Sequence, residues 1–214
     1  NVNECVGGLD QMTVAISGGS GLVSYQWQSS TTGAEPWANA VGTGSTTNTF
    51  TPPSVTPGTT YYRVLVNATG SDCQQAVSSV VTAIIIPDIT VTTQPTNVNE
   101  CVGGLDQMTV AISGGSGLIS YQWQSSTTGN EPWANAIGTG STTNTFTPPS
   151  ATPGTTYYRV LVNASNSDCQ QAVSSVVTAI IIPDITVTTQ PTNVNECVGG
   201  LDQMTVAISG GSGL

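Results

Sequence analysis

The sequence predicts an all-β protein built from tandem β-sandwich domains. Three observations lead to this prediction: a repeat of 96 residues, short β-branched segments separated by turn residues, and a lack of helical periodicity. Residues 1–96 and 97–192 differ at only six positions, and residues 193–214 match residues 97–118 without a mismatch. A unit of this length is too long for a solenoid repeat and has the size of one small β-sandwich domain.

The first half of the repeat, taken from its second copy, contains three expected strands. Apolar and polar side chains alternate in residues 89–93, and Pro95 follows, which is typical of an edge strand. Residues 108–112 lie between two Gly-Gly turns. Residues 119–124 place Trp123 on one face and two glutamines on the other. We expect Trp123, like Trp27 in the first copy, to form the centre of a sandwich core.

The second half of the repeat contains three further expected strands, which again end at Pro, Gly or Asn-Ser-Asp turns. They are residues 143–147, 157–162 and 175–182. In the first copy, the alternation of side chains along the strand predicts that Tyr62 and Val64 face the core. Arg63 is expected to face outward, over a tyrosine or near a carboxylate. Short strands with turn signals about every 8–12 residues predict a Greek-key sandwich of the immunoglobulin-like or fibronectin-III-like type.

The domain boundaries are expected at the Pro-Asp pairs of the repeat. Residues 1–87 then form a domain that lacks its first strand, residues 88–183 form a complete domain, and residues 184–214 form the first two strands of a third. One Pro-Asp pair without a Gly/Ser spacer joins the domains, so we expect them to lie end to end in a stiff array. Because the sequence stops partway through a unit, we expect it to be a window of a longer array.

The composition excludes several classes of function. The chain has two Arg, no Lys, no His and twelve Asp+Glu, for a net charge of −10. This balance argues against nucleic-acid partners and anionic membrane surfaces, and the apolar runs are too short for membrane insertion. Without His there is no Ser-His-Asp triad and no imidazole metal ligand, and without Lys there is no Schiff base. We therefore expect no enzyme activity, no cofactor and no metal site.

The five cysteines leave two disulfide patterns open, with free thiols as a third alternative. The intradomain pattern pairs Cys5 with Cys73 and Cys101 with Cys169, each 68 residues apart. The strand assignment places Cys5 and Cys73 near opposite ends of one sandwich, roughly 20 Å or more apart. A disulfide needs Cα atoms within about 7 Å. The favoured pattern is interdomain: Cys5 bonds Cys169, and Cys101 bonds a cysteine of the following repeat.

Two tryptophans outside the expected strands are candidate ligand-binding residues. Trp37 and Trp133 follow Glu-Pro in a loop, where they either cover the sheet edge or face a ligand such as a glycan. Packing is the favoured interpretation.

Two motifs carry a resemblance to a known family. Tyr-Gln-Trp occurs at residues 25–27 and 121–123, and Pro-Gly-Thr-Thr-Tyr-Tyr-Arg-Val-Leu-Val follows at residues 57–66 and 153–162, each with a later Cys. This pattern resembles the immunoglobulin-like repeats of giant Bacteroidota cell-surface adhesins, including gliding-motility adhesins exported by the type IX secretion system. The resemblance covers the whole chain and implies a bacterial, extracellular location at the cell surface.

The function expected from these observations is structural. We expect a stalk region of a long extracellular filament or cell-surface adhesin that serves attachment or gliding motility. Near-identical repeats are typical of a spacer, which contributes only length. A catalytic site, in contrast, needs specific residues at one place in the chain. The alternatives are a multivalent glycan-binding module and the spacer of a larger secreted enzyme. The expected partners are neighbouring repeats of the chain, with surface glycans or other filament chains as further candidates.

Overall fold

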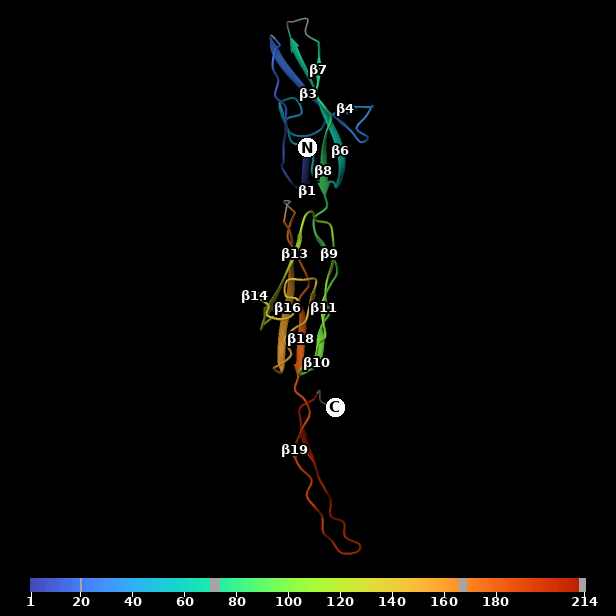
Figure 1. Ribbon diagram of the computed structural model, residues 1–214, viewed down its shortest axis with the longest axis vertical. Helices are drawn as coiled ribbons and strands as arrows, with labels where there is room; N and C mark the ends of the chain where they lie inside the picture. The colour runs from blue at the N-terminus through green and yellow to red at the C-terminus, as the bar shows by residue number, and fades with distance from the viewer. Residues whose placement is uncertain (20, 70–73, 166–168, 212–214) are drawn as a thin grey trace. The chain divides into compact units, whose positions relative to one another are not determined.

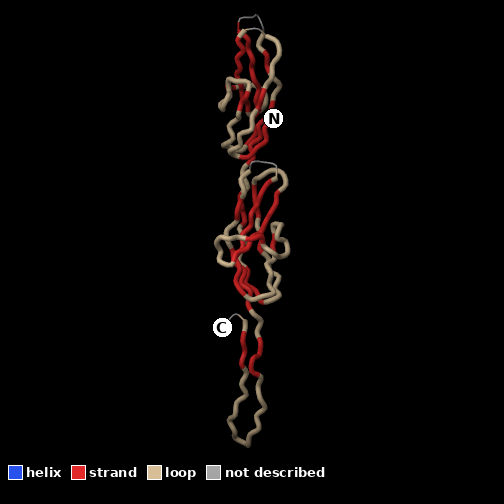
Figure 2. Tube along the Cα trace, turned by 90° about the vertical axis from the view of Figure 1, so that its left-hand side faces the viewer, coloured by secondary structure: helices blue, strands red, loops and turns tan. Residues whose placement is uncertain are grey.

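A computed structural model describes residues 1–19, 21–69, 74–165 and 169–211, and this part of the chain contains strands, turns and loops (Figure 1, Figure 2). It contains no helix long and apolar enough to cross a membrane. The described residues form two compact units. Unit 1 comprises residues 1–90, 112–120 and 162–172, and unit 2 comprises residues 91–111, 121–161 and 173–214.

The first repeat forms one large sheet and one small, two-stranded sheet. Its strands are β1 (Val2–Cys5), β2 (Met12–Thr13), β3 (Leu22–Ser30), β4 (Ala38–Asn39), β5 (Thr49–Phe50), β6 (Gly58–Thr69), β7 (Ala76–Val77) and β8 (Val81–Ile86). The large sheet has the order β1-β8-β6-β3-β4, with β7 also paired to β6, and the small sheet pairs β2 with β5. Figure 1 shows the long strands β3, β6 and β8 of the large sheet.

The second repeat has the same topology, with one further pair. Its strands are β9 (Thr90–Thr93), β10 (Val98–Cys101), β11 (Met108–Thr109), β12 (Ala111–Ser113), β13 (Ile119–Ser126), β14 (Ala134–Asn135), β15 (Thr145–Phe146), β16 (Gly154–Ala164), β17 (Ala172–Val173) and β18 (Val177–Ile182). The large sheet has the order β10-β18-β16-β13-β14, and the small pairs are β11-β15 and β12-β9. The predicted all-β fold of repeated sandwiches is confirmed.

Three strands of each repeat were not expected from the sequence: the two-residue strands β4 and β7 with their counterparts β14 and β17, and the longer strands β1 and β10. β1 and β10 pair in parallel with β8 and β18, and in the first repeat Cys5 lies opposite Ile86. The sequence Val-Asn-Glu-Cys has neither alternation nor a β-branched run, and its partner strand lies about 80 residues later in the chain, so local pattern does not reveal it. This strand matters because it ends at the cysteine.

The core of the first repeat is centred on aromatic rings from both sheets. Trp27 stacks on Phe50 with ring centroids 5.2 Å apart, and Phe50 contacts Tyr62 at the same centroid distance. The indole N–H of Trp27 donates to the carbonyl oxygen of Thr47 at 2.9 Å, which satisfies its buried polar group. Val64 is fully buried beside them, as alternation predicted. Burying Trp27 between the sheets therefore stabilises the sandwich.

The buried tyrosines of the two repeats have perturbed acidity. Tyr62 and Tyr158 are each 4% exposed. Desolvation by burial raises the pKa of each phenol above its ordinary value of 10, and a hydrogen bond to the side chain of Thr60 or Thr156 opposes this shift in part. Both side chains thus favour the neutral form in the folded protein.

The third segment of the chain forms a two-stranded ribbon. It contains β19 (Thr186–Thr189) and β20 (Ala207–Ser209), which are antiparallel with a register shift after Val187. Its apolar side chains are largely exposed, including Ile185 at 65% and Ile208 at 60%.

Candidate functional site

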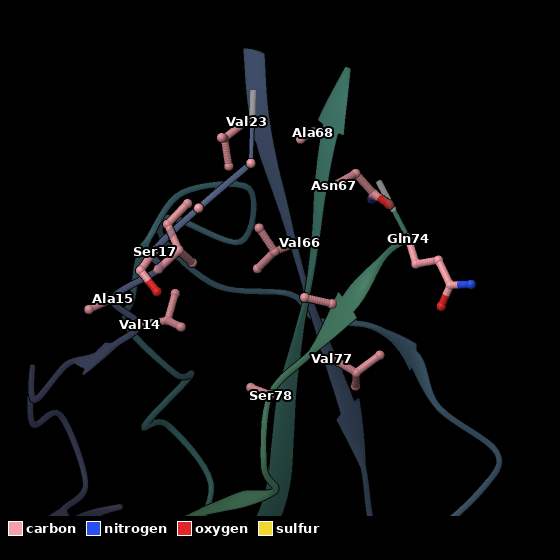
Figure 3. Close-up of a pocket in the computed structure, with 14 residues that line it drawn as sticks. Val14, Ala15, Ser17, Val23, Val66, Asn67, Ala68, Gln74, Val77 and Ser78 are labelled. Carbon is pink, nitrogen blue, oxygen red and sulfur yellow. The ribbon is translucent and has the colours of Figure 1, made fainter. Parts of the chain in front are cut away.

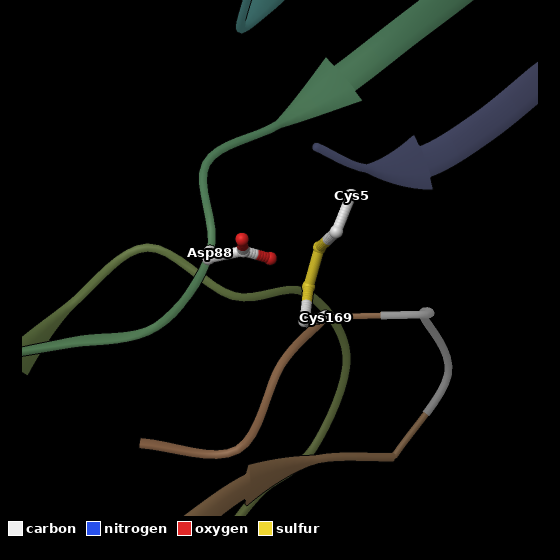
Figure 4. A group of neighbouring side chains, drawn as sticks. All are labelled: Cys5, Asp88 and Cys169. Atoms are coloured by element: carbon white, nitrogen blue, oxygen red, sulfur yellow. A yellow bond between two sulfur atoms is a disulfide. The ribbon is translucent and has the colours of Figure 1, made fainter. Parts of the chain in front are cut away.

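A disulfide joins the two repeats between Cys5 and Cys169 (Figure 4). The two Cα atoms are 4.9 Å apart, within the usual range for a disulfide, and both residues belong to unit 1. Cys101 and Cys197 are free and exposed, so Cys101 and Cys169 are not bonded to each other in this structure. Cys73, which the intradomain alternative pairs with Cys5, lies outside the described residues. A disulfide of this kind is typical of extracellular proteins.

The position of Cys5 is fixed by the end of the parallel strand pair. Cys5 is fully buried and lies opposite Ile86 at the end of β8. The carbonyl oxygen of Ile86 accepts a hydrogen bond from the N–H of Val6 at 3.1 Å. The chain then turns, because the N–H of Gly8 donates to the carbonyl oxygen of Cys5 at 3.0 Å. The hydroxyl of Ser54 holds this turn by donating to the carbonyl oxygen of Gly8 at 2.7 Å.

A buried carboxylate supports the same turn. Glu4 is 1% exposed, and its Oε2 accepts a hydrogen bond from the N–H of Asp10 at 2.8 Å. A Cβ atom at Gly8 would overlap the Glu4 carboxylate, so only glycine leaves room for this arrangement. Glu100 and Gly104 repeat the arrangement next to Cys101. The Glu before the cysteine therefore fixes the turn that follows it.

The partner cysteine is held by the Pro-Asp connection between the repeats. The N–H of Gln170 donates to Oδ1 of Asp88 at 3.2 Å, which fixes the residue after Cys169. The N–H of Gly115 donates to the carbonyl oxygen of Pro87 at 2.8 Å. Gly114 has φ +76, and a Cβ at this position would overlap the carbonyl group of Asp88. The Gly-Gly turn thus packs closely on the connection because it lacks side chains.

These residues bring three possible donor atoms together. The two sulfur atoms and a carboxylate oxygen of Asp88 lie within 4.8 Å of one another, and Figure 4 shows the Asp88 side chain turned toward the disulfide. Metal binding by cysteine requires the thiolate, and both sulfur atoms are used in the disulfide. In the oxidised state the arrangement is therefore a covalent link, with Asp88 as the residue that orients the loop after Cys169.

The tryptophan candidates belong to a different cluster. The guanidinium of Arg63 lies over the ring of Trp37, 4.5 Å from its centroid. Arg63 also donates to Oε1 of Gln28 at 2.9 Å and to Oε1 of Glu35 at 3.1 Å. The other oxygen of Glu35 accepts from the N–H of Trp37 at 3.2 Å. This cluster attaches the loop that contains Trp37 to the outer face of the large sheet.

The second repeat reproduces the cluster atom by atom. Arg159 lies 4.4 Å from the ring centroid of Trp133 and donates to Gln124 and Glu131 at 2.9 and 3.1 Å. Both tryptophans are half-buried. The expectation that the arginine lies outward near a carboxylate is met, but it lies over a tryptophan rather than a tyrosine. A guanidinium therefore covers one face of each ring that was considered for glycan stacking.

Three residues of these sites were not expected from the sequence. Glu4, Asp88 and Gln28 hold the cysteine turn, the loop after Cys169 and the arginine, respectively. The sequence does contain a signal for Glu4, namely the Gly four residues later. This signal can be interpreted only once the turn that brings Gly8 against the Glu4 carboxylate is known. Gln28 and Arg63 face each other because β3 and β6 pair in the register Gln28–Arg63.

The fold and the repeated site define the class: the protein consists of tandem immunoglobulin-like β-sandwich repeats. The sequence profile of the family described as Domain of unknown function (DUF8696) matches residues 2–87 and again residues 90–183. The chain therefore belongs to this family and contains two successive copies of its domain. No protein with a curated description matches the sequence.

The chain matches solved structures of tandem immunoglobulin and fibronectin domains. A three-immunoglobulin-domain structure of titin is 12% identical, with a TM-score of 0.56, and the match covers 97% of this chain and 72% of that one. Immunoglobulin domains 1–5 of Sidekick-1 (12% identity, TM-score 0.35) are matched over 89% of this chain, which spans 41% of their length. Chicken CNTN1 FN1–FN3 domains (15% identity, TM-score 0.36) are matched over 87% and 65% of the two chains. At this identity, the titin match shows the fold alone.

Proposed function

We propose that this chain is a stalk region of a long extracellular filament or cell-surface adhesin, and that it serves attachment or gliding motility at a bacterial surface. The observation that carries the proposal is the disulfide between Cys5 and Cys169, which joins two near-identical sandwich repeats covalently. The resemblance of the Tyr-Gln-Trp and Pro-Gly-Thr-Thr-Tyr-Tyr-Arg motifs to Bacteroidota adhesin repeats supports the bacterial location and the role in motility.

The disulfide gives the chain a specific mechanical property. A force applied between Asn1 and Leu214 passes through the Cys5–Cys169 bond. The two cysteines are 164 positions apart in the sequence, and the segment between them cannot be extended while the bond is intact. A stalk that transmits tension gains from this arrangement, because unfolding inside the loop does not lengthen the chain.

The surface chemistry supports a passive structural part. With two Arg and a net charge of −10, the chain is acidic and lacks the cations that nucleic acid requires. Both arginines are already engaged with a carboxylate and a tryptophan ring. We propose that the chain is not an enzyme, and that its partners are the neighbouring repeats and other filament chains.

A domain-exchange experiment in the producing cells tests this function. Deleting the repeats is expected to shorten the surface structure in electron micrographs and to reduce attachment. Replacing them with the same number of unrelated immunoglobulin-like domains is expected to restore both, because length is the proposed role. If only the native sequence restores attachment, or if Trp37→Ala with Trp133→Ala removes it, the repeats bind a ligand and the stalk proposal is wrong.

A further inference from the structure

The disulfide site contains the donor atoms of a metal site once its bond is reduced. The sulfur atoms of Cys5 and Cys169 and a carboxylate oxygen of Asp88 lie within 4.8 Å of one another. All three residues belong to unit 1, and Figure 4 shows the Asp88 side chain turned toward the sulfur atoms. Among the described residues, no other group of three His, Cys, Asp or Glu side chains is placed to hold a metal ion. Reduction therefore leaves two thiols and one carboxylate together at this place.

The main cavity of the first repeat is a site of a different kind. It has a volume of about 390 Å³, and Val14, Val23 and Val66 form part of its wall (Figure 3). Its described lining residues are apolar or uncharged, and none of them is Cys, Asp or Glu. This cavity therefore offers no ligands for a metal ion, in contrast to the disulfide site.

The spacing of the three donor atoms suits a tetrahedral metal ion. Zinc binds sulfur at about 2.3 Å and carboxylate oxygen at about 2.0–2.2 Å, so neighbouring donors of a tetrahedral site lie roughly 3.5–3.8 Å apart. Donor atoms within 4.8 Å of one another reach this spacing by small movements of their side chains. The Cα atoms of Cys5 and Cys169 are 4.9 Å apart, so a rotation about each Cα–Cβ bond separates the sulfur atoms without moving the backbone.

The types of donor atom favour zinc over harder cations. Thiolates select thiophilic metals such as Zn²⁺, whereas Ca²⁺ and Mg²⁺ prefer sites built from oxygen atoms alone. The lack of His in the chain excludes imidazole ligands, but it leaves sites made of thiolates and a carboxylate. Two thiolates and a carboxylate this close repel one another, and a bound dication offsets this repulsion.

Backbone hydrogen bonds hold both sides of the site. On one side, the N–H of Val6, directly after Cys5, donates to the carbonyl oxygen of Ile86 at 3.1 Å. On the other side, the N–H of Gln170 donates to Oδ1 of Asp88 at 3.2 Å. A hydrogen bond of this kind fixes the orientation of a carboxylate that binds metal. Neither bond involves a sulfur atom, so both can hold the donor positions after reduction.

The surroundings of the site allow a metal ion to enter. Cys5 is fully buried, whereas Cys169 and Asp88 are only half-buried. The half-buried side gives an entry path and a place for a water molecule as fourth ligand. The net charge of −10 favours the approach of cations, and the only two cationic side chains, Arg63 and Arg159, are engaged in the tryptophan clusters.

We propose that Cys5, Cys169 and Asp88 bind Zn²⁺ in the reduced chain, with a water molecule as the fourth ligand. The link between the two cysteines is then a disulfide under oxidising conditions and a metal bridge under reducing conditions in the presence of zinc. This metal site goes beyond the stalk function and does not depend on it.

The two forms interconvert by thiol–disulfide exchange. Two molecules of a small thiol reduce the disulfide, which yields two Cys thiols and one small disulfide. Zn²⁺ then displaces the two thiol protons as it binds. In the reverse direction, a small disulfide accepts two electrons from the two thiolates, the bond between the cysteine sulfur atoms forms again, and Zn²⁺ and two small thiolates are released.

Zinc titration of the reduced chain tests the proposal. Every protein carries Cys73→Ser, Cys101→Ser and Cys197→Ser, so that Cys5 and Cys169 are the only cysteines. The reductant is removed without air before the titration, because small thiols compete for zinc. We expect the reduced chain to bind one Zn²⁺ and the oxidised chain to bind none at this site. Replacing Zn²⁺ by Co²⁺ is expected to give the sulfur-to-cobalt charge-transfer absorption of a thiolate site.

Substitutions of the carboxylate separate this site from binding by two thiols alone. Asp88→Asn is expected to weaken zinc binding about tenfold or more, because even residues that only support a ligand typically contribute 10–100-fold to metal affinity. The matched control is Asp184→Asn, which changes the corresponding residue of the next repeat and is expected to leave the affinity unchanged. Cys169→Ser is expected to remove the charge-transfer band of a site with two thiolates.

Tryptophan fluorescence shows in each titration whether the reduced chain is folded. Zinc binding by a folded reduced chain that depends on Asp88 supports the proposal. A lack of zinc binding by the reduced chain, or equal affinity of the Asp88→Asn variant, would overturn it. Binding that occurs only when the reduced chain is unfolded would also overturn it, because the site requires the folded turns around Cys5 and Cys169.

Discussion

Breaking the Cys5–Cys169 bond is expected to lengthen the part of the chain that a pulling force can extend. The bond closes a loop between two cysteines that are 164 positions apart in the sequence. At a maximum of about 3.6 Å per residue, this loop stores about 590 Å of contour length. With the bond intact, only the residues before Cys5 and after Cys169 can extend, which is about 180 Å. The difference is several times larger than the extendable length itself.

Single-molecule pulling between the two ends of the chain measures this difference. The extension of the oxidised chain is expected to stop at the contour length of the residues outside the loop. Addition of a reductant is expected to release the contour length of the loop as well. The Cys5→Ser variant is expected to extend fully without reductant. Cys101→Ser is the matched control, because Cys101 is free and exposed, and this variant is expected to stay short under oxidising conditions.

Two results would refute this reasoning. The first is a full extension of the oxidised chain, which would mean that no bond closes the loop. The second is a long extension of the Cys101→Ser variant, which would mean that a different cysteine carries the link.

Three further predictions concern the folded repeats. Because burial raises the pKa of Tyr62 and Tyr158, the native state holds these protons more tightly than the unfolded state; stability is unaffected below about pH 10 and falls as the pH rises toward the folded pKa. Absorbance titration of the phenolates and alkaline unfolding of the Tyr→Phe variants check this. Arg63→Gln is expected to cost about 1 kcal/mol and to expose Trp37 to a fluorescence quencher, and unchanged quenching would contradict the cluster. Trp123→Ala is expected to cost about 3–5 kcal/mol in urea unfolding, because the side chain is fully buried.

The sandwich was predictable from sequence because its signals are local. The alternation around Trp123 and along the strand that contains Val64 identifies core positions without knowledge of the partner strands. The phase of the repeat then shows where each domain recurs. The strands β1 and β10 were not predictable, because their parallel pairing joins segments about 80 residues apart and their sequence has no strand pattern.

The sites were predictable only in part for the same reason. Alternation placed Arg63 on the outer face, but the loop that folds over it depends on tertiary packing, which brought Trp37 rather than a tyrosine. The cysteines could be placed at the ends of a sandwich by counting residues. The carboxylates that hold their loops, Glu4 and Asp88, act through turns whose geometry a single sequence does not specify.

The measurement that tests the account most directly is a tryptic digest without reduction. The chain has no Lys and only two Arg, so trypsin yields three peptides, residues 1–63, 64–159 and 160–214. Cys5 lies in the first, and Cys169 lies in the third. We expect a cross-linked mass that joins the first and third peptides and separates on reduction. A mass that joins the first and second peptides would place Cys5 on Cys73 or Cys101 and contradict the bond between Cys5 and Cys169.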